Sequence, residues 1–506
     1  MKVLFVNPVV RYHDHPRHVP LGMLQLLAIL ERDHPEVRFQ LYDANAHRVD
    51  DFQNRDFSRG LDKALSLDDF DVVAIGGLIT AYNYIKSAAK RIRELKKDIR
   101  LVAGGGFFTS MPFEMMRLMP EIDYGVVGEA YVSFPNLLGA IDRGEYPDYV
   151  KGLMMRNDES VEMTEAQLLI PDLDWLPFPA YKYAPLETYF KYSGILMSDE
   201  AMRSRKRLDA CMSLGCPFLC KFCWDLGISS NKVRQGRPGK DTLVRHHSAR
   251  YIADYVQHLR SEFMNYPPEH YPVDFVAWFD ENIVAHDAQT GFTWLNSIEE
   301  ELWRRGLVAD CIKKGEPHDS SKCNGPHYGG TSHSGLIRKD TLRTLRRCGF
   351  TYLDYGLESF SLSILKGLGK GATPETNKRA VKWTLEAGIS PIPNQIIMFP
   401  DETWGTIGQM LDAWEATGIV SKPFIATPYP GSEWFVKYRG FILDQYGGNL
   451  EAFLCDLEDA TKLTALLTNR FSPVEAVGIQ NIMAEAAKTG DFKNARRLLG
   501  LSVRAV

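Results

Sequence analysis

The chain has 506 residues, of which 45% are hydrophobic and 24% are charged, a composition typical of a globular protein of about three domains. Its net charge of -5 gives no electrostatic reason to expect nucleic acid or an anionic membrane as a partner. No apolar run approaches the length that spans a bilayer, and the first residues are typical of a strand rather than a signal peptide. Eight cysteines in so long a chain do not form a disulfide framework, which predicts a reducing, cytoplasmic location.

Residues 1–150 alternate short apolar strands with amphipathic helices. Most of the strands are apolar on both faces, as a parallel sheet covered by helices requires. The expected strands are Val3–Val6, Phe39–Tyr42, Val72–Ile75, Leu101–Val102 and Tyr124–Val127. This pattern predicts a Rossmann-like ligand-binding domain.

Three of these strands end in small residues, and the carboxyl edge of an open α/β sheet is where ligands bind. The three turns are Gly76-Gly77, Gly104-Gly105-Gly106 and Gly128-Glu129. A G-x-G-x-x-G fingerprint that opens a helix is absent from this region, which disfavours NAD as the ligand.

The next part of the chain, residues 151–200, is expected to be an extended linker because it carries Pro171, Pro177 and Pro179. Residues 201–435 then return to a strand-and-helix pattern, which predicts a partial (β/α)6 barrel with its chemistry at the carboxyl ends of the strands. The six expected strands are Ala210–Ser213, Phe275–Phe279, Leu307–Cys311, Tyr352–Tyr355, Ile392–Met398 and Phe424–Thr427. Residues 436–506 are largely helical in pattern and are expected to form a cap.

Three cysteines after the first barrel strand carry the strongest chemical signal. Cys216, Cys220 and Cys223 have the spacing C-x3-C-x2-C. Soft thiolates suit iron–sulfur centres, and three of them can hold one face of a cubane cluster while one iron stays open to another ligand. A zinc site requires paired C-x2-C units or a matching Cys/His pair, so this spacing favours the cluster over zinc.

This segment, with the aromatic Phe222 before the last cysteine, resembles the signature of the radical S-adenosylmethionine (SAM) family. The resemblance implies a [4Fe–4S] cluster on the three cysteines and SAM at the barrel mouth. Carboxylates at strand ends can instead cap helices or form salt bridges, but two such motifs at these strands together favour contact with SAM. The implied SAM residues are Phe222, Asp280, Glu281, Asn282, Glu358 and Ser359.

The run from Gly104 to Thr109, followed by Gly128-Glu129-Ala130 and then the cysteine motif, is similar to the B12-dependent radical SAM enzymes. In that family, glycine-rich turns admit the tail of cobalamin. The D-x-H-x-x-G box that supplies a histidine to cobalt is missing, so the resemblance implies base-off cobalamin without a lower histidine. The implied cobalamin residues are Gly76, Gly77, Leu78, Gly104, Gly105, Gly106, Thr109, Gly128 and Glu129.

The resemblance implies a methyltransferase. SAM cleavage by a low-potential electron yields a 5′-deoxyadenosyl radical that activates an sp3 carbon, and cobalamin delivers the methyl group. A non-methylating enzyme of the same architecture, which forms or rearranges rings, is the alternative. No protein side chain is predicted to act as a catalytic acid or base, because the cofactors carry the difficult steps.

Two stretches bear on the substrate. Residues 231–247 form a basic loop that includes Lys232 and Arg245, and residues 312–335 contain His318, Cys323, His327 and His333. The second stretch can be a metal site, but its irregular spacing favours a lid or long loop. Mobile loops at a barrel mouth suit a peptide substrate, and the chain also looks similar to the archaeal enzymes that C-methylate a glutamine of methyl-coenzyme M reductase. A small natural product or lipid is the alternative substrate.

Overall fold

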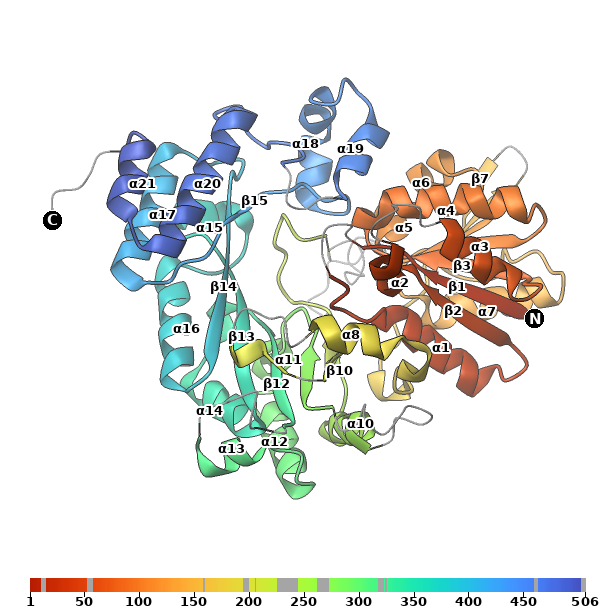
Figure 1. Ribbon diagram of the computed structural model, residues 1–506, viewed down its shortest axis with the longest axis horizontal. Coiled ribbons are helices and arrows are strands. Elements are labelled where there is room, and N and C mark those ends of the chain that lie inside the picture. The colour runs from red at the N-terminus through yellow and green to blue at the C-terminus, as the bar shows by residue number, and fades with distance from the viewer. Residues whose placement is uncertain are drawn as a thin grey trace.

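The structure is a computed structural model of residues 1–506. It describes all residues except 11–14, 52–57, 158–159, 194–199, 205, 225–243, 262–272, 317–322, 324, 459–462 and 502–506. Two sheets lie side by side in Figure 1, the amino-terminal sheet on the right and the barrel sheet on the left.

The amino-terminal sheet has seven strands in the order β2-β1-β3-β4-β5-β6-β7. The first five are parallel, and the last two add antiparallel strands at one edge. The strands are β1 (Lys2–Asn7), β2 (Arg38–Asp43), β3 (Val72–Gly76), β4 (Arg100–Gly104), β5 (Tyr124–Val126), β6 (Leu153–Asn157) and β7 (Ser160–Met163).

Alternate residues of β1 enter two separate cores, which explains why this strand is apolar throughout. Val3 and Phe5 pack into the core on the side of α1 and α7, whereas Leu4 and Val6 pack into the core on the side of α3 and α4. The helices are α1 (Leu21–Asp33), α2 (Ala44–Asp51), α3 (Ser58–Ser66), α4 (Tyr82–Leu95), α5 (Gly106–Ser110), α6 (Pro112–Leu118) and α7 (Ala130–Asp142). The five strands predicted from alternating segments are therefore present, with helices on both faces.

Strands β6 and β7 lie within residues 151–200, where the sequence predicts only a linker. Val126 pairs with Leu153, and the hairpin continues to Met163. Both strands are short, and β7 is mostly exposed. The sequence therefore shows little hydrophobic alternation from which this hairpin could be predicted. The sheet thus extends past residue 150, and the predicted domain boundary itself stays a prediction.

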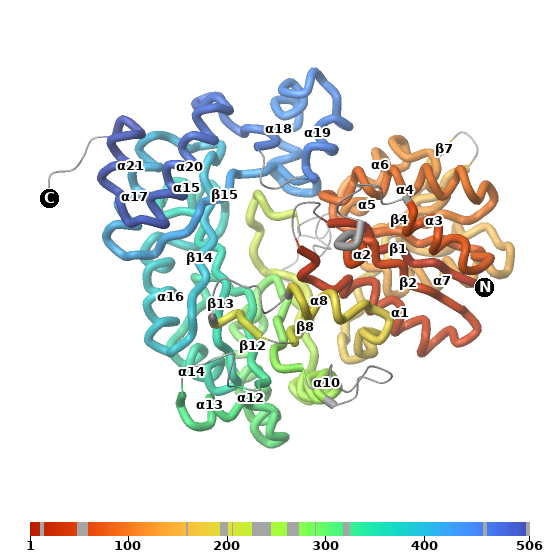
Figure 2. Tube along the Cα trace, viewed as in Figure 1, coloured from red at the N-terminus to blue at the C-terminus, as the bar shows by residue number. Residues whose placement is uncertain are grey.

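After β7 the chain crosses toward the barrel through short 3-10 turns and helix α8 (Leu186–Ser193), as the tube in Figure 2 shows. Tyr189 of α8 donates a hydrogen bond of 2.6 Å to Asp43 at the end of β2. The connection is therefore fastened to the amino-terminal sheet by a buried contact.

The barrel sheet has six parallel strands in the order β15-β14-β13-β12-β11-β8. They are β8 (Arg207–Ala210), β11 (Phe275–Trp278), β12 (His327–Ser332), β13 (Phe350–Glu358), β14 (Ser390–Ile397) and β15 (Phe424–Ile425). A separate ribbon pairs β9 (Ser213–Leu214) with β10 (Arg245–His246) in antiparallel fashion. The predicted α/β partial barrel is confirmed.

The prediction for the third barrel strand is wrong. The segment expected as Leu307–Cys311 leads into helix α13 (Asp310–Lys314), and the third strand is β12, within the stretch expected to be a loop. Glycines weaken strand propensity, which hides β12 in the sequence. A Cβ atom at Gly329 would lie 2.0 Å from the ring of Tyr352, so the glycine admits this ring from the neighbouring strand.

Helices surround the outer side of the barrel sheet, and the four described helices that follow the sheet divide into two pairs. Helices α20 and α21 lie beside α17, whereas α19 contacts α4 of the amino-terminal domain (Figure 1). The barrel helices are α10 (Ala249–Ser261), α11 (Ala285–Gln289), α12 (Trp294–Arg304), α13, α14 (Lys339–Cys348), α15 (Leu362–Leu368), α16 (Pro374–Glu386) and α17 (Trp404–Thr417). The last four are α18 (Glu433–Asp444), α19 (Leu450–Asp456), α20 (Pro473–Thr489) and α21 (Phe492–Leu498).

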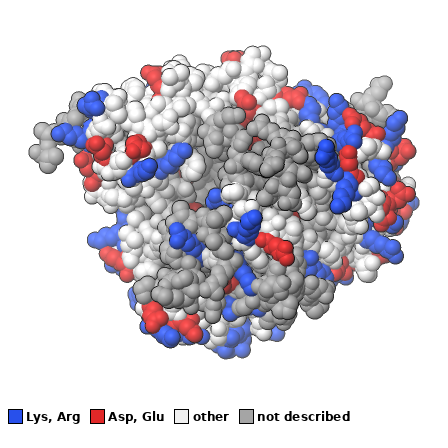
Figure 3. Space-filling model, viewed as in Figure 1, with Lys and Arg blue, Asp and Glu red and all other residues white. Residues whose placement is uncertain are grey.

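Acidic and basic side chains are interspersed over the amino-terminal domain at the right of Figure 3. Mixed charges of this kind are ordinary for a protein surface. Among the described helices, none combines the length and apolar character needed to cross a membrane.

Candidate active site between the two sheets

The loop that carries the three cysteines is held at its start by two acidic residues that follow β11. Asp280 accepts a hydrogen bond of 3.0 Å from the Met212 amide and a second from the Ser213 hydroxyl. Glu281 accepts one of 3.0 Å from the Gly215 amide. Two carboxylates therefore fix the backbone directly before Cys216. Burial raises the pKa of Asp280 to about 6.

The end of the same loop is held by later parts of the barrel. The Lys221 amide donates a hydrogen bond of 3.0 Å to the carbonyl of Leu368, and the Lys221 carbonyl accepts one of 3.1 Å from the Trp434 amide. The Cys223 amide donates to the Cys220 carbonyl at 3.0 Å, which makes a turn between the two cysteines. Both ends of the motif are thus fixed to the carboxyl side of the sheet.

The cysteines fit a cubane cluster better than a single metal ion. Among the described residues, Cys216, Cys220 and Cys223 do not gather into a group tight enough for one ion. In a cubane each thiolate binds a different iron, so a wider separation of the sulfurs is required. Cys220 is buried and the other two are partly exposed, and their assignment to the [4Fe–4S] cluster stays a prediction.

A buried ion pair lies against this loop. Lys370 Nζ is 2.8 Å from Glu358 Oε1, and both side chains are less than a tenth exposed. Burial alone lowers the pKa of the lysine, but the Glu358 carboxylate and the Cys220 thiol raise it, and the net direction is upward. The ammonium therefore stays charged beside the cysteines, where it stabilises negative charge on thiolates.

His333 at the end of β12 completes this side of the loop. Its ring stacks on Phe218 with 3.8 Å between the ring centroids, and its Nε2 lies 2.8 Å from the Lys370 carbonyl. Burial lowers the pKa of His333 to about 3. The imidazole is consequently neutral at physiological pH and supports the cysteine loop through its contact with Phe218.

The other residues predicted to contact SAM gather in the same region, and their assignment to SAM stays a prediction. Asn282 accepts a hydrogen bond from the His333 amide at 3.4 Å, and its buried Nδ2 has no hydrogen-bond partner among the described residues. An unpaired buried amide is costly, so this group suits a polar ligand. Ser359 accepts from the Ser361 amide at 3.0 Å, and Phe222 packs against Trp434.

The glycine turns predicted for cobalamin lie together at the carboxyl edge of the amino-terminal sheet. A Cβ atom at Gly76 would lie 2.7 Å from the Gly104 carbonyl oxygen, and one at Gly105 would lie 2.9 Å from backbone atoms of Gly77. Gly105 also has a φ of +83°, which favours glycine. Thr109 ties the next turn to this group, because its hydroxyl accepts a hydrogen bond of 2.9 Å from the Gly128 amide.

This glycine edge faces the cysteine loop. A Cβ atom at Gly431, which precedes α18, would lie 3.0 Å from Ser110 Oγ and 3.4 Å from the Trp224 carbonyl oxygen. Ser110 ends α5, the helix that follows the Gly104-Gly105 turn, and Trp224 follows Cys223 directly. Leu78, predicted to lie near cobalt, is 43% exposed. Its role stays a prediction.

Glu129 has a protein partner that the sequence does not reveal. It forms an ion pair with Arg245 of β10, whose guanidinium also donates a hydrogen bond of 2.9 Å to the Ile170 carbonyl. Because β10 pairs with β9 next to the cysteine loop, this ion pair joins the two halves of the molecule. Lys232 and the other basic residues of the predicted loop before 244 lie outside the described residues.

The stretch 312–335 does not form a single lid. His333 lies at the carboxyl end of β12 and His327 at its amino end, so the two residues belong to different sites. His318 lies outside the described residues.

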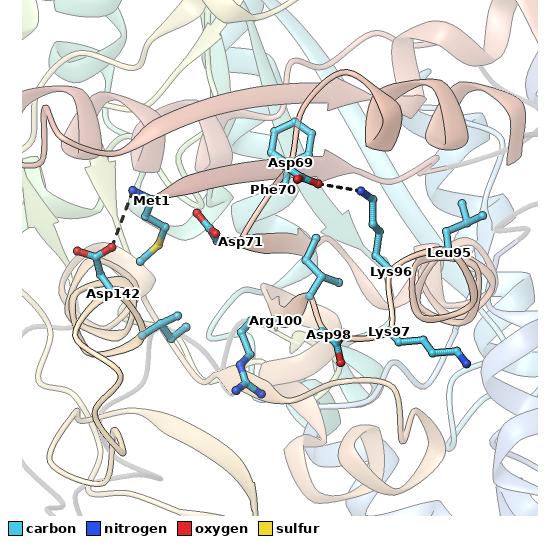
Figure 4. Close-up of a pocket in the computed structure, with 12 residues that line it drawn as sticks. Met1, Asp69, Phe70, Asp71, Leu95, Lys96, Lys97, Asp98, Arg100 and Asp142 are labelled. Atoms are coloured by element: carbon cyan, nitrogen blue, oxygen red, sulfur yellow. Dashed lines mark hydrogen bonds and ion pairs between the residues drawn. The ribbon is translucent and has the colours of Figure 1, made fainter.

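A surface pocket of about 650 Å³ lies elsewhere, at the amino ends of β1, β3 and β4. Figure 4 shows its charged rim, with Met1 facing Asp142 and Lys96 facing Asp69. It is at the edge of the sheet opposite the glycine turns, so we assign no cofactor to it.

Comparison with known proteins agrees with this arrangement. A family model of the B12 binding domain matches residues 9–138, and one of the radical SAM superfamily matches residues 295–413. An uncharacterized methyltransferase of Pyrococcus horikoshii is 26% identical over 437 residues, which cover 85% of this chain and 82% of that protein. An anaerobic magnesium-protoporphyrin IX monomethyl ester cyclase of Synechocystis sp. is 22% identical over 65% of this chain and 56% of its own length.

The fold is also similar to a solved structure. The radical SAM methyltransferase TsrM from Kitasatospora setae, with cobalamin and a [4Fe–4S] cluster bound, aligns with a TM-score of 0.61 and 16% identity. The alignment covers 87% of this chain and 75% of that one.

The two domains and their order define a B12-binding radical SAM protein. The chain is similar to the cobalamin-dependent radical SAM enzymes of the methyltransferase type, and its two domains imply cobalamin, SAM and a [4Fe–4S] cluster as cofactors. As a radical SAM enzyme it requires a reductant.

Sequence reasoning missed Lys370 and the pairing of Arg245. The sequence does contain a signal for Lys370, because the glycines on both sides of it predict a turn. In the structure both Gly369 and Gly371 have positive φ. No local signal indicates the partner of Arg245, because Glu129 is 116 residues away.

Proposed function

We propose that this protein transfers a methyl group from SAM, through cobalamin, to an unactivated sp3 carbon of its substrate. The observation that carries the proposal is the approach of the glycine edge to the cysteine loop at Gly431. A methyl donor and a radical source must reach one substrate carbon, so their two sites must face each other across one cavity.

The bound cofactors supply reductive SAM cleavage and a transferable methyl group. The protein contributes position and charge. Asp280 and Glu281 fix the start of the cysteine loop, whereas Lys370 places a cation beside it. The buried amide of Asn282 offers a hydrogen bond to a polar group of SAM. Gly76 and Gly105 let the two turns at the carboxyl edge of the amino-terminal sheet approach closely.

For the substrate we keep the peptide hypothesis, with a glutamine of methyl-coenzyme M reductase as its particular form. The hypothesis rested on two loops expected at the barrel mouth. The stretch 312–335 no longer supports it, because His327 and Cys323 lie away from the mouth. The basic loop before Arg245 lies largely outside the described residues.

A small natural product or lipid is the alternative substrate. The similarity to the magnesium-protoporphyrin IX monomethyl ester cyclase of Synechocystis sp. supports a non-methylating reaction as a further alternative.

The test is an anaerobic assay with SAM, a low-potential reductant and methylcobalamin, against glutamine-containing peptides and a panel of small metabolites. We expect S-adenosylhomocysteine and 5′-deoxyadenosine to form together, with a mass gain of one methyl group on a peptide side chain. A gain on a metabolite alone contradicts the peptide hypothesis. Production of 5′-deoxyadenosine without S-adenosylhomocysteine or any methylated product contradicts methyl transfer.

Two cysteine variants, one that removes the motif and one that serves as its control, test whether the products depend on the three-cysteine motif. Replacement of Cys216, Cys220 and Cys223 together by alanine should abolish both products, because the cluster has no other thiolates in the motif. Cys455→Ser changes a cysteine on α19, outside the motif, and should leave product formation unchanged.

A further inference from the structure

Two cysteines and a histidine converge at a place remote from the cysteine loop. Cys311 Sγ lies 3.0 Å from His327 Nε2 and 3.2 Å from Cys323 Sγ, and Cys323 Sγ lies 3.5 Å from His327 Nε2. Among the described residues, this is the group of three or more His, Cys, Asp or Glu side chains whose ligand atoms all lie within 4.8 Å of one another. Cys311 and His327 are buried and Cys323 is partly exposed.

The cluster is at the amino end of the barrel sheet. His327 is the first residue of β12, and the residue that follows the strand, His333, supports the cysteine loop at the other end. Six residue steps along a strand span about 20 Å, which separates this place from the candidate active site. In Figure 1 helix α13, which carries Cys311, lies at the lower edge of the barrel.

The local fold brings the three side chains together from both ends of one connection. Helix α13 ends at Gly315, which has a φ of +71° and turns the chain back. The chain returns beside β11, where a Cβ atom at Gly325 would lie 2.1 Å from the Asp274 carbonyl oxygen. The His327 amide then donates a hydrogen bond of 3.0 Å to the same carbonyl. The glycine therefore lets the chain enter β12 with the histidine facing Cys311.

We propose that Cys311, Cys323 and His327 bind one Zn²⁺ ion that fastens the connection from α13 to β12. Zinc prefers thiolate and imidazole ligands in a tetrahedral arrangement. Two sulfurs at about 2.3 Å from a tetrahedral zinc are about 3.8 Å apart, so the observed separation of 3.2 Å needs to open by only about half an ångström.

Two other features favour a metal over a disulfide or ordinary packing. The sulfur separation of 3.2 Å is well beyond the bond length of about 2.05 Å in a disulfide. The guanidinium of Arg346 on α14 lies near Cys311 and donates a hydrogen bond of 3.2 Å to the Glu316 carbonyl, so a fixed positive charge lies beside the site. The position at the amino end of the sheet indicates a structural role, since barrel chemistry belongs at the carboxyl ends.

The experiment measures metals in the full-length protein, purified anaerobically, supplied with one equivalent of Zn²⁺ and desalted. We expect about one zinc per chain in the wild type, and the same in the Cys455→Ser control. We expect it to remain when Cys216, Cys220 and Cys223 are all replaced by alanine, which removes the iron–sulfur site. Cys323→Ser, which changes the partly exposed ligand, should lose zinc at least tenfold more readily to a chelator while its iron content is unchanged.

X-ray absorption at the zinc edge of the wild type tests the ligands without any variant. Two sulfurs at about 2.3 Å and a nitrogen at about 2.0 Å are expected. Zinc coordinated without sulfur overturns the proposal, as does equal retention of zinc in Cys323→Ser. A Cys311–Cys323 disulfide in the anaerobic protein, or iron in place of zinc on these ligands, also overturns it. The result does not depend on methyl transfer, because neither measurement involves turnover.

Discussion

Removal of the buried cation beside the cysteine loop gives a sharp test of how this site is built. In Lys370→Met the side chain keeps its length but loses the ammonium that lies 2.8 Å from Glu358 Oε1. The carboxylate then stays buried without its partner. Loss of one member of a buried ion pair costs about 3–5 kcal/mol, chiefly because the remaining charge is desolvated.

The assay compares urea unfolding of the cofactor-loaded proteins under anaerobic conditions, followed by fluorescence and by the visible absorbance of the cluster. The matched control is Lys366→Met on α15, because Lys366 is exposed, so its loss should change the free energy of unfolding by less than about 0.5 kcal/mol. The double variant Lys370→Met/Glu358→Gln should recover part of the loss, since glutamine carries no charge. Equal unfolding curves for Lys370→Met and Lys366→Met would refute the argument that this pair is buried beside the cluster.

Two further changes test separate parts of the structure. Burial raises the pKa of Glu402 from 4.5 to about 7, so the folded protein binds more protons than the unfolded chain between these values and loses stability as pH rises through them. Glu402→Gln should remove up to about 3 kcal/mol of this dependence, and parallel wild-type and variant stabilities between about pH 5 and about pH 8 would contradict it. Gly105→Ala should weaken cobalamin binding in an equilibrium titration, because its Cβ would lie 2.9 Å from the Gly77 backbone. Gly144→Ala, with a similar positive φ but nothing within 4 Å of its Cβ, is the control, and equal cobalamin affinity in the two variants would count against the predicted cradle.

The sequence predicts the parts of this fold that depend on local hydrophobic pattern. Alternate residues of strand β1 pack into two different cores, so the strand is apolar on both faces. Its buried place in a parallel sheet can therefore be predicted from the sequence. Strand β12 could not be predicted in this way, because Gly329 and Gly330 have no side chains to contribute to a hydrophobic pattern. The tertiary structure explains them: the ring of Tyr352 occupies the space beside Gly329, and Ile283 and Trp278 occupy the space beside Gly330.

In the candidate site, too, local features could be predicted from the sequence and long-range contacts could not. The spacing of Cys216, Cys220 and Cys223 is contained within one short segment, so it can be recognised without any tertiary structure. The partners of Asp280 could not be predicted, because its oxygens bind backbone and hydroxyl groups 67 and 68 residues away. The strand end was identified from the sequence, but the support that Asp280 gives to the loop depends on the pairing of β8 with β11.

The proposed zinc site and the support at His333 then follow from one weakness in β12. Adjacent glycines cost a strand conformational entropy and give it no side-chain packing, and the pairing with β13 shifts register between Tyr328 and Gly329. Such a strand needs to be held at its two ends. At the carboxyl end His333 stacks on Phe218 and thereby contacts the cysteine loop. At the amino end His327 meets Cys311 and Cys323. A metal bound there would hold the strand that places His333, so loss of zinc should first loosen the cysteine loop and only then affect turnover.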